Sequence, residues 1–529
     1  MFHTIISGGT VADGTLTAPR RADVGIQNGK IAAVGDLSHA SAEKIISAEG
    51  KLVTPGFIDI HRHCDLAYFR PDFGEAELAQ GLTTIIGGQC GLSAAPCSGP
   101  YAEEIEHYMN AVNGDVPCGT PLATVGDYIN ALSKRTFPIH VGTEVGMGTL
   151  RANVAGFLTE NLSQDEVRAI WALLDESLRA GALAVSLGMG YAPECFYTPR
   201  QLQEVLAPLK GTGTLVTCHM RQEGSEVEKS VAEMIELARY LETPVQISHL
   251  KAIGRVNWGK KVPQVIAMID QARKSGIDIG FDVYPYTAGS TLLLHVLPPE
   301  FLKGGVAQLP TTLMDPALRP LIRKRMETGT DFENISLLVG WENIIMASLN
   351  QPHNVPFAGM TIADIAAAQN KDPFDTLFDM LAEEKGEITM IDHVASEEDI
   401  ALLLKHEAGL IISDSIYPTS GLRHPRLYGT FVRVLERYVK EKKVLTLTEA
   451  IHKMTLAPAR RFNLAGKGCI KEGFDADICI FDPDALHEEG TYRTPERYAS
   501  GMEAVLVMGE VALEKGTFTR KHTGRLIRR

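Results

Sequence analysis

The sequence has no excess of basic residues, and this limits the partners that the protein can have. It contains 51 Lys and Arg against 65 Asp and Glu, so the formal net charge of the 529-residue chain is −14. A chain this acidic repels the phosphates of nucleic acids and the anionic surface of a membrane. We therefore expect neither a nucleic-acid partner nor a membrane partner.

Long hydrophobic runs and a secretory leader are also absent. No stretch approaches the roughly 18 to 20 apolar residues that span a bilayer. The N-terminal residues, MFHTIISGGTV, lack the basic and apolar regions of a signal peptide. The eight cysteines are sparse and show no disulfide-scaffold spacing. These absences favour a cytoplasmic protein whose functional cysteines bind metal or react, rather than form disulfides.

The two ends of the chain resemble each other and are expected to form one small domain. Residues 22–36 alternate apolar positions around an Asn-Gly turn, and residues 476–484 and 502–518 form further short strands with Gly turns. We predict a β-sandwich made of residues 1–54 and 465–529. The domain 55–464 would be inserted between its halves, because 529 residues are too many for one ordinary core.

Between these ends, short β-rich runs alternate with helical stretches such as 163–181 and 226–242. Eight such runs are visible: 56–63, 83–91, 138–146, 182–191, 215–220, 245–251, 278–286 and 410–415. Eight strands alternating with helices predict a (β/α)8 barrel of the TIM type, with a doubly wound open sheet as the alternative. Residues 291–409 form an insertion between strands seven and eight that is too long for an ordinary barrel loop. Structured insertions of this length usually serve as lids or binding elements.

Several of the predicted strands end in residues that bind metals. They are His61 and His63 on strand one, Cys90 on strand two, His219 on strand five, His249 on strand six and Asp414 on strand eight. Alternate residues of a strand share a face, and the strand ends of a barrel converge on one mouth. Thiolate and imidazole suit Zn²⁺, which can make hydroxide at neutral pH from a bound water. A carboxylate beside that water can act as general base.

These residues lie in stretches that resemble the amidohydrolase superfamily, and within it the N-acyl-D-amino-acid deacylases (D-aminoacylases). The matching stretches are PGFIDIHRHCD, GLTTIIGGQCGLSAAP, TCHMRQEG, VQISHLKAIGRVNWGK, YPYTAGST, HPRLYGTFVRVLERYV and ADICIFDP. The most specific motif is GGQCG, because most amidohydrolases have no cysteine ligand there. The resemblance implies a zinc-dependent hydrolase that cleaves an N-acyl-D-amino acid, its small-molecule partner, into a carboxylate and a free D-amino acid.

The resemblance also implies roles for individual residues. Cys90, His219 and His249 would hold a tight zinc ion, and His61, His63 and Asp414 a second, weaker one. Asp414 would act as catalytic base and acid. Lys251 and Arg426 would bind the substrate carboxylate, with hydrogen bonds added by Tyr191, Tyr284 and Ser290.

Departures from the family pattern bear on the substrate. The strand-four run has no lysine for a carbamate bridge, which disfavours hydantoinase and dihydroorotase activities, and strand three has Met147 where family members often have Gly-His. The apolar stretch after Ser290, TLLLHVLPPE, lacks the basic residue expected of D-glutamate-specific relatives, which favours neutral or hydrophobic side chains. The alternatives are a hydrolase of cyclic amides or D-residue dipeptides and a non-catalytic assembly protein. All six residues of metal-binding type are present, which disfavours the non-catalytic assembly protein.

Overall fold

Parallel strands form the centre of the computed structural model, which describes residues 1–117, 119–157 and 161–529. One sheet has the order β6 (Phe57–Asp59), β8 (Leu82–Gly87) and β9 (His140–Thr143). The second has the order β10 (Val145–Gly146), β11 (Val185–Gly188), β12 (Val216–His219), β13 (Val245–Ile247), β14 (Ile279–Val283) and β18 (Gly409–Ile411). Each of the eight predicted β-rich runs contains at least one of these strands.

Two connections relate the parallel sheets to one another. The strands β9 and β10 are separated by a single residue, Glu144. The short strand β7 (Arg62–His63), just after β6, pairs in parallel with β19 (Ser415–Ile416), just after β18. The first and last of the eight runs therefore lie side by side at the ends that carry the metal-binding residue types.

The predicted helices 163–181 and 226–242 are confirmed as α5 (Gln164–Ala180) and α7 (Val227–Leu241). Ser163 begins α5 with a capping box, because its hydroxyl accepts a hydrogen bond from the Glu166 N–H and the Glu166 carboxylate accepts one from the Ser163 N–H. Gly181 ends the helix at φ 118°, a left-handed conformation that favours glycine.

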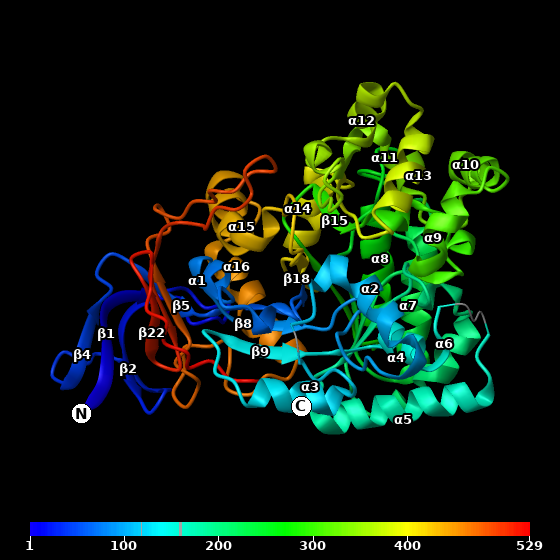
Figure 1. The fold of residues 1–529 in the computed structure, drawn as a ribbon. Helices are drawn as coiled ribbons and strands as arrows, with labels where there is room; N and C mark the ends of the chain where they lie inside the picture. The colour runs from blue at the N-terminus through cyan, green and yellow to red at the C-terminus, as the bar shows by residue number, and fades with distance from the viewer. Residues whose placement is uncertain (118, 158–160) are drawn as a thin grey trace.

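Strands from both chain ends join in one nine-stranded sheet. Its members are β1 (Phe2–Val11), β2 (Arg20–Gln27), β3 (Lys30–Gly35), β4 (Ala42–Ser47), β5 (Leu52–Pro55), β20 (Ile478–Phe481), β21 (Met502–Val507), β22 (Glu510–Glu514) and β23 (Thr517–Phe518). The two halves meet where β5 pairs antiparallel with β20. Figure 1 shows the blue N-terminal and red C-terminal strands together on one side of the molecule.

A buried ion cluster joins this sheet to the parallel strands. Asp477, just before β20, lies 3.2 Å from His140 of β9 and accepts a 2.7 Å hydrogen bond from the Lys467 ammonium. Burial alone would raise the pKa of Asp477, but His140 and Lys467 lower it far below the usual range. The carboxylate is therefore charged and paired, and it connects the two parts of the fold.

The long segment after β14 folds into its own elements. Strands β15 (Ala288–Leu292), β16 (Ile344–Met346) and β17 (Thr389–His393) form an antiparallel sheet. The helices are α9 (Gly305–Met314), α10 (Arg319–Thr328), α11 (Ile335–Val339), α12 (Ile362–Gln369) and α13 (Pro373–Glu383). In Figure 1 these green and yellow helices rise on one side of the parallel strands. The following helix, α14 (Glu397–Lys405), packs on β18 and on α8 (Lys261–Lys274), so the end of the predicted insertion packs with the parallel strands.

A search of the described residues for a helix able to cross a bilayer found none with the necessary length and apolar content.

Candidate active site

The ends of the parallel strands and the long insertion line a pocket, the usual form of a small-molecule site. Five of the six predicted metal ligands line it: His63, Cys90, His219, His249 and Asp414. His61 is 1% exposed and lies beneath them, with its imidazole ring 5.6 Å from that of His63 and 5.2 Å from that of His249. The structure therefore brings all six predicted ligands together.

Cys90, His219 and His249 form one group that could hold a metal ion. The Cys90 sulfur lies 3.4 Å from His249 Nε2, and His219 Nδ1 lies 2.9 Å from the same atom. Ligands of a tetrahedral zinc ion are separated by about 3.5 Å for a sulfur–nitrogen pair and about 3.3 Å for two nitrogens. The donor atoms thus fit a zinc ion with small adjustments, and the donor set of one thiolate and two imidazoles suits that metal.

His61, His63 and Asp414 come together beside this group. The Nε2 atoms of His61 and His63 each lie 3.4 Å from Asp414 Oδ1. His61 Nε2 also lies 3.3 Å from the Cys90 sulfur, and His61, His63 and Cys90 form a second group that could hold a metal. Cys90 therefore belongs to both groups, a shared position that the sequence did not indicate.

Three of the predicted ligands have a left-handed backbone, which is uncommon for residues other than glycine. The φ angles are 55° at Cys90, 37° at His249 and 53° at Asp414. Each residue lies two or three positions beyond the end of its strand. Such a conformation costs conformational energy and persists where the surroundings impose it, as at functional sites.

Burial sets the protonation of these side chains. It lowers the pKa of His219 and His249 well below the usual value, so both imidazoles are neutral and able to bind a metal. It raises the pKa of the Cys90 thiol, with help from the charge of Asp414, so a metal must displace a proton there. Burial also opposes ionisation of Asp414, but Arg426 and the nearby histidines bring its pKa well below the usual value.

Two carboxylates behind the ligands were missed by the sequence reasoning. Glu223 Oε1 lies 3.0 Å from His249 Nδ1, and Glu223 Oε2 lies 2.6 Å from the Lys251 ammonium. Asp282, in β14, accepts a 2.6 Å hydrogen bond from the His249 N–H. A carboxylate at Nδ1 leaves Nε2 of His249 free for a metal, which is the usual arrangement around metal-binding histidines. The signal for Glu223 was its position four residues after His219.

Of the residues predicted to bind substrate, Lys251, Tyr191, Tyr284 and Ser290 line the pocket. Arg426 is 1% exposed and is not among the lining residues. Its guanidinium donates a 2.9 Å hydrogen bond to Asp414 Oδ2 and another of 2.9 Å to the Ser290 carbonyl. The Tyr191 hydroxyl is hydrogen-bonded to the Thr291 hydroxyl at 2.8 Å.

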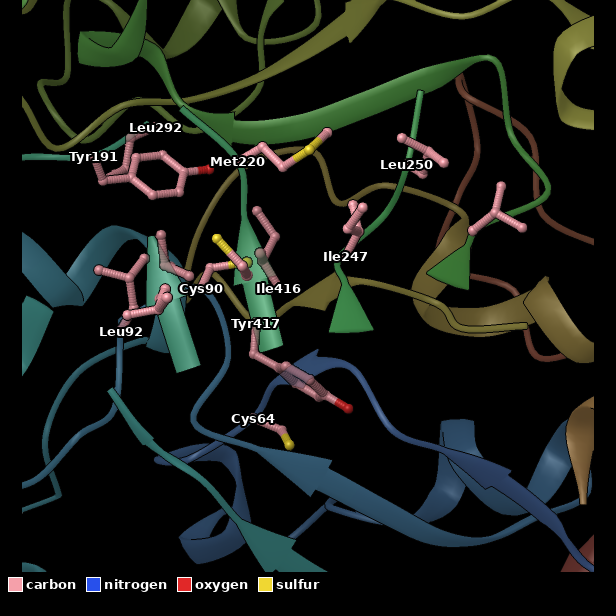
Figure 2. Close-up of a cluster of buried hydrophobic side chains, with 14 of the residues drawn as sticks. Cys64, Cys90, Leu92, Tyr191, Met220, Ile247, Leu250, Leu292, Ile416 and Tyr417 are labelled. Carbon is pink, nitrogen blue, oxygen red and sulfur yellow. The ribbon is translucent and has the colours of Figure 1, made fainter. Parts of the chain in front are cut away.

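The insertion contributes pocket residues that were not predicted, of which the ionisable ones are His295, Glu333 and Asp392. The leucines 292–294, on which the expectation of a neutral or hydrophobic side chain depended, are buried and do not line this pocket. Figure 2 shows Leu292 among buried side chains, together with Cys90 and Tyr191. Met147, the departure on strand three, is the first residue of α4 (Met147–Ala155) and is fully buried in the core.

Comparison with known proteins agrees with this geometry. Residues 44–513 match the model of the amidohydrolase family, which is most of the chain. The chain belongs to the amidohydrolase family. This amidohydrolase is 30% identical to a D-aminoacylase of Alcaligenes xylosoxydans xylosoxydans, over 100% of this chain and 98% of the relative. It is 32% identical to the N-acyl-D-glutamate deacylase of the same organism, over 99% and 96% of the two chains.

Comparison with solved structures leads to the same family. A crystal structure of D-aminoacylase, described as defining a novel subset of amidohydrolases, matches with a TM-score of 0.84 and 31% identity over the whole of both chains. The N-acyl-D-glutamate deacylase of Bordetella bronchiseptica, complexed with zinc and a phosphonate inhibitor that mimics the tetrahedral intermediate, matches with a TM-score of 0.82 and 30% identity, also over both whole chains. The mixed α/β fold of this amidohydrolase is therefore that of the D-aminoacylase structures.

Proposed function

We propose that this amidohydrolase is a zinc-dependent N-acyl-D-amino-acid deacylase. It would hydrolyse the amide bond of an N-acyl-D-amino acid to give a carboxylate and the free D-amino acid. The observation that carries this proposal is the group formed by Cys90, His219 and His249. A cysteine ligand next to two histidines is the feature by which the sequence resembles the D-aminoacylases rather than most amidohydrolases. Two relatives matched over nearly their full length are named D-aminoacylase and N-acyl-D-glutamate deacylase.

In this proposal, Cys90, His219 and His249 hold one zinc ion tightly, and His61 and His63 hold a second, weaker ion together with Asp414. The distances and neutral imidazoles described above support the first site. When bound, zinc supplies a Lewis acid for the amide carbonyl and lowers the pKa of an adjacent water. Glu223 fixes the tautomer of His249 and so orients a ligand of the tight site.

Asp414 is proposed as the catalytic base and acid. Its carboxylate lines the pocket beside the tight metal group, and its pKa lies well below the usual value, so it is ionised at neutral pH. It can take the proton of the attacking water at one oxygen and then pass it to the leaving nitrogen. The Arg426 guanidinium donates a 2.9 Å hydrogen bond to the other oxygen, Oδ2, and so orients the carboxylate of Asp414.

Lys251, together with Tyr284 and Ser290, is proposed to bind the substrate carboxylate. The ammonium of Lys251 lies 2.6 Å from Glu223, 3.1 Å from the His249 carbonyl oxygen and 3.0 Å from His249 Nδ1. Because Nδ1 donates its own hydrogen to Glu223 in this proposal, it accepts none from Lys251, and one of the three ammonium donors is left for the substrate. Arg426, predicted as a second carboxylate ligand, would act there only after a rotation away from Asp414. Tyr191 would contribute mainly its ring face, since Thr291 engages its hydroxyl.

We also propose the finer architecture. The parallel strands, with the β7–β19 pair, would close as a (β/α)8 barrel over residues 55–464, with the insertion at about 291–409. The terminal sheet would fold over its own core as a β-sandwich of residues 1–54 and 465–529, a view supported by one apolar cluster that contains side chains from both halves. A cytoplasmic location is supported by the seven cysteines in the described part of the chain, all of which are free thiols.

A substrate panel tests the proposed activity. Amine release is followed from N-acetyl-D-methionine, N-acetyl-L-methionine and N-acetyl-D-glutamate, before and after chelation and after zinc is returned. We expect turnover of a D-substrate without turnover of the L-substrate, loss of turnover on chelation and its return with zinc. Hydrolysis of a cyclic amide or of a D-residue dipeptide in place of all three would contradict the proposal. Matches to hydantoinases, at 15–18% identity, support only the fold and not that alternative activity.

A further inference from the structure

Each cation near the pocket already has an anionic partner. Lys251 is paired with Glu223 at 2.6 Å, and Arg426 with Asp414 at 2.9 Å. Arg426 is buried in its pair, and Lys251 is part-buried, with its one remaining donor assigned above to the α-carboxylate of the substrate. Any further carboxylate in the pocket must therefore find its partner elsewhere.

The cavity next to the pocket offers no spare cation either. Its lining includes Arg221, whose guanidinium contacts Glu233 through Nε at 3.1 Å and through Nη2 at 2.9 Å, and donates to two backbone carbonyls. Asp331, also in that lining, is paired with Arg325 at 2.9 Å. Arg221 and Asp331 are therefore each paired with a residue that does not line the pocket.

Two pocket carboxylates remain, and both come from the insertion. Glu333 is 4% exposed; its Oε2 accepts a 3.2 Å hydrogen bond from the Glu223 N–H, and its Oε1 is buried without a partner. Asp392 is 3% exposed, and among the described residues it has no ion pair. Burial raises the pKa of Asp392 to about 6 and that of Glu333 well above the usual value. Buried carboxylates of this kind are costly unless a ligand compensates them.

The nearest imidazole does not compensate them. His295 lies in the same group of side chains as Glu333, but Glu333 Oε1 has no hydrogen-bond partner and so is not bonded to it. The ring of Tyr191 packs on His295 with 4.8 Å between centroids. An aromatic face next to a carboxylate is a favourable place for a cation.

The space beyond these residues suits a long side chain. Three residues, Tyr191, His295 and Glu333, line both the pocket and the adjoining cavity. A side chain that leaves the reacting centre and passes this shared wall meets the unpartnered oxygen of Glu333. A short substrate side chain would leave the Glu333 oxygen without a partner. An acidic side chain would be repelled by it.

We propose that the pocket selects N-acyl-D-amino acids whose side chain ends in a cation, such as D-lysine or D-arginine, with Glu333 and Asp392 as the residues that determine this specificity. The proposal rests on the deacylase function proposed above and names the substrate class of the same site. It keeps the sequence-based expectation that an acidic side chain is disfavoured. It differs from the expected preference for neutral or hydrophobic side chains. Of the leucines that suggested it, Leu292 and Leu293 line neither space, and Leu294 lines only the adjoining cavity, where the aliphatic part of a long side chain would pass.

The competing role for Glu333 is to orient a metal ligand. His219 Nε2 also lacks a hydrogen-bond partner and belongs to the same group as Glu333 and His295. In that case, removal of the Glu333 charge would weaken zinc binding and slow all substrates alike. A specificity role predicts instead a change in the ratio between substrates, at constant zinc content.

The test compares kcat/KM for N-acetyl-D-lysine and N-acetyl-D-norleucine, which differ by the terminal ammonium, in zinc-loaded protein. We expect the wild type to favour the lysine substrate by about tenfold or more, and Glu333→Gln to reduce that ratio by about tenfold through KM. Asp392→Asn, measured in parallel, should reduce the ratio in the same direction. The control is Glu342→Gln, an exposed carboxylate of the insertion, which should leave the ratio unchanged.

Three results would overturn the inference. A wild type that favours norleucine, or ratios unchanged in both pocket variants, would show that these carboxylates do not select a cation. An equal loss for both substrates together with a lower zinc content in Glu333→Gln would assign Glu333 to the orientation of His219. Zinc-loaded protein that hydrolyses no N-acyl-D-amino acid at all would overturn the proposed function itself, and this inference with it.

Discussion

Replacement of Asp414 by Asn tests the proposed base most sharply, because the amide has nearly the same shape but does not take up a proton. Loss of a general base costs about 10² to 10⁴ in rate. The one carboxylate lies 3.4 Å from both His61 and His63 and, in this proposal, would serve as both base and acid, so we expect the upper part of this range. A 10³- to 10⁴-fold fall in kcat corresponds to about 4 to 5.5 kcal/mol in activation free energy.

The same substitution should lower stability, since it leaves the guanidinium of Arg426 buried without its carboxylate. Breaking a buried ion pair typically costs about 3 to 5 kcal/mol. Zinc per chain should stay near the wild-type value, because the tight group does not include Asp414. The assay combines kcat for an N-acyl-D-amino acid, zinc content and denaturant unfolding. Asp165→Asn, at a side chain that is 90% exposed, is the control. A variant with kcat within tenfold of the wild type would refute the role of Asp414.

Three further predictions follow from the same geometry. Cys90→Ser should lose most bound zinc on dialysis against a weak chelator, as measured by metal analysis, because hydroxyl is a poorer zinc ligand than thiolate. Glu223→Gln should weaken zinc binding about 10- to 100-fold in a competition titration, since it removes the carboxylate at His249 Nδ1. Asp477→Asn should lower the free energy of unfolding by about 3 to 5 kcal/mol, because it breaks a buried ion cluster. The pKa of Asp477 is lower in the folded state than in the unfolded state. Its contribution to the free energy of unfolding is therefore complete above about pH 4 and is lost as the pH falls. Unfolding curves measured between pH 7 and pH 3 would detect this loss.

Much of the fold followed from local patterns in the chain. The eight β-rich runs each contain a parallel strand because these strands are buried on both faces and therefore read as short apolar segments. The Asn28-Gly29 turn connects β2 and β3, as the alternation around it predicted, and both residues have positive φ angles of 53° and 74°. The six metal-binding residue types were predictable because each stands at or just beyond a strand end.

What could not be predicted depends on contacts between segments far apart in sequence. Glu333 and Asp392 belong to an insertion whose fold cannot be predicted from a simple hydrophobic periodicity. Only the tertiary structure shows that they line the pocket. Arg426 was expected to face the substrate, whereas its side chain points to Asp414. The sharing of Cys90 by two candidate metal groups likewise depends on distances of 3.3 and 3.4 Å to histidines from two other strands.

The central claim is that one zinc ion at Cys90, His219 and His249 enables hydrolysis of N-acyl-D-amino acids. The most direct measurement adds zinc stepwise to chelated protein and follows release of the D-amino acid at each step. We expect activity to rise with added zinc and to be complete near one equivalent per chain in the wild type, with no rise in Cys90→Ser. Full activity in the chelated protein, or equal activation of Cys90→Ser, would contradict it.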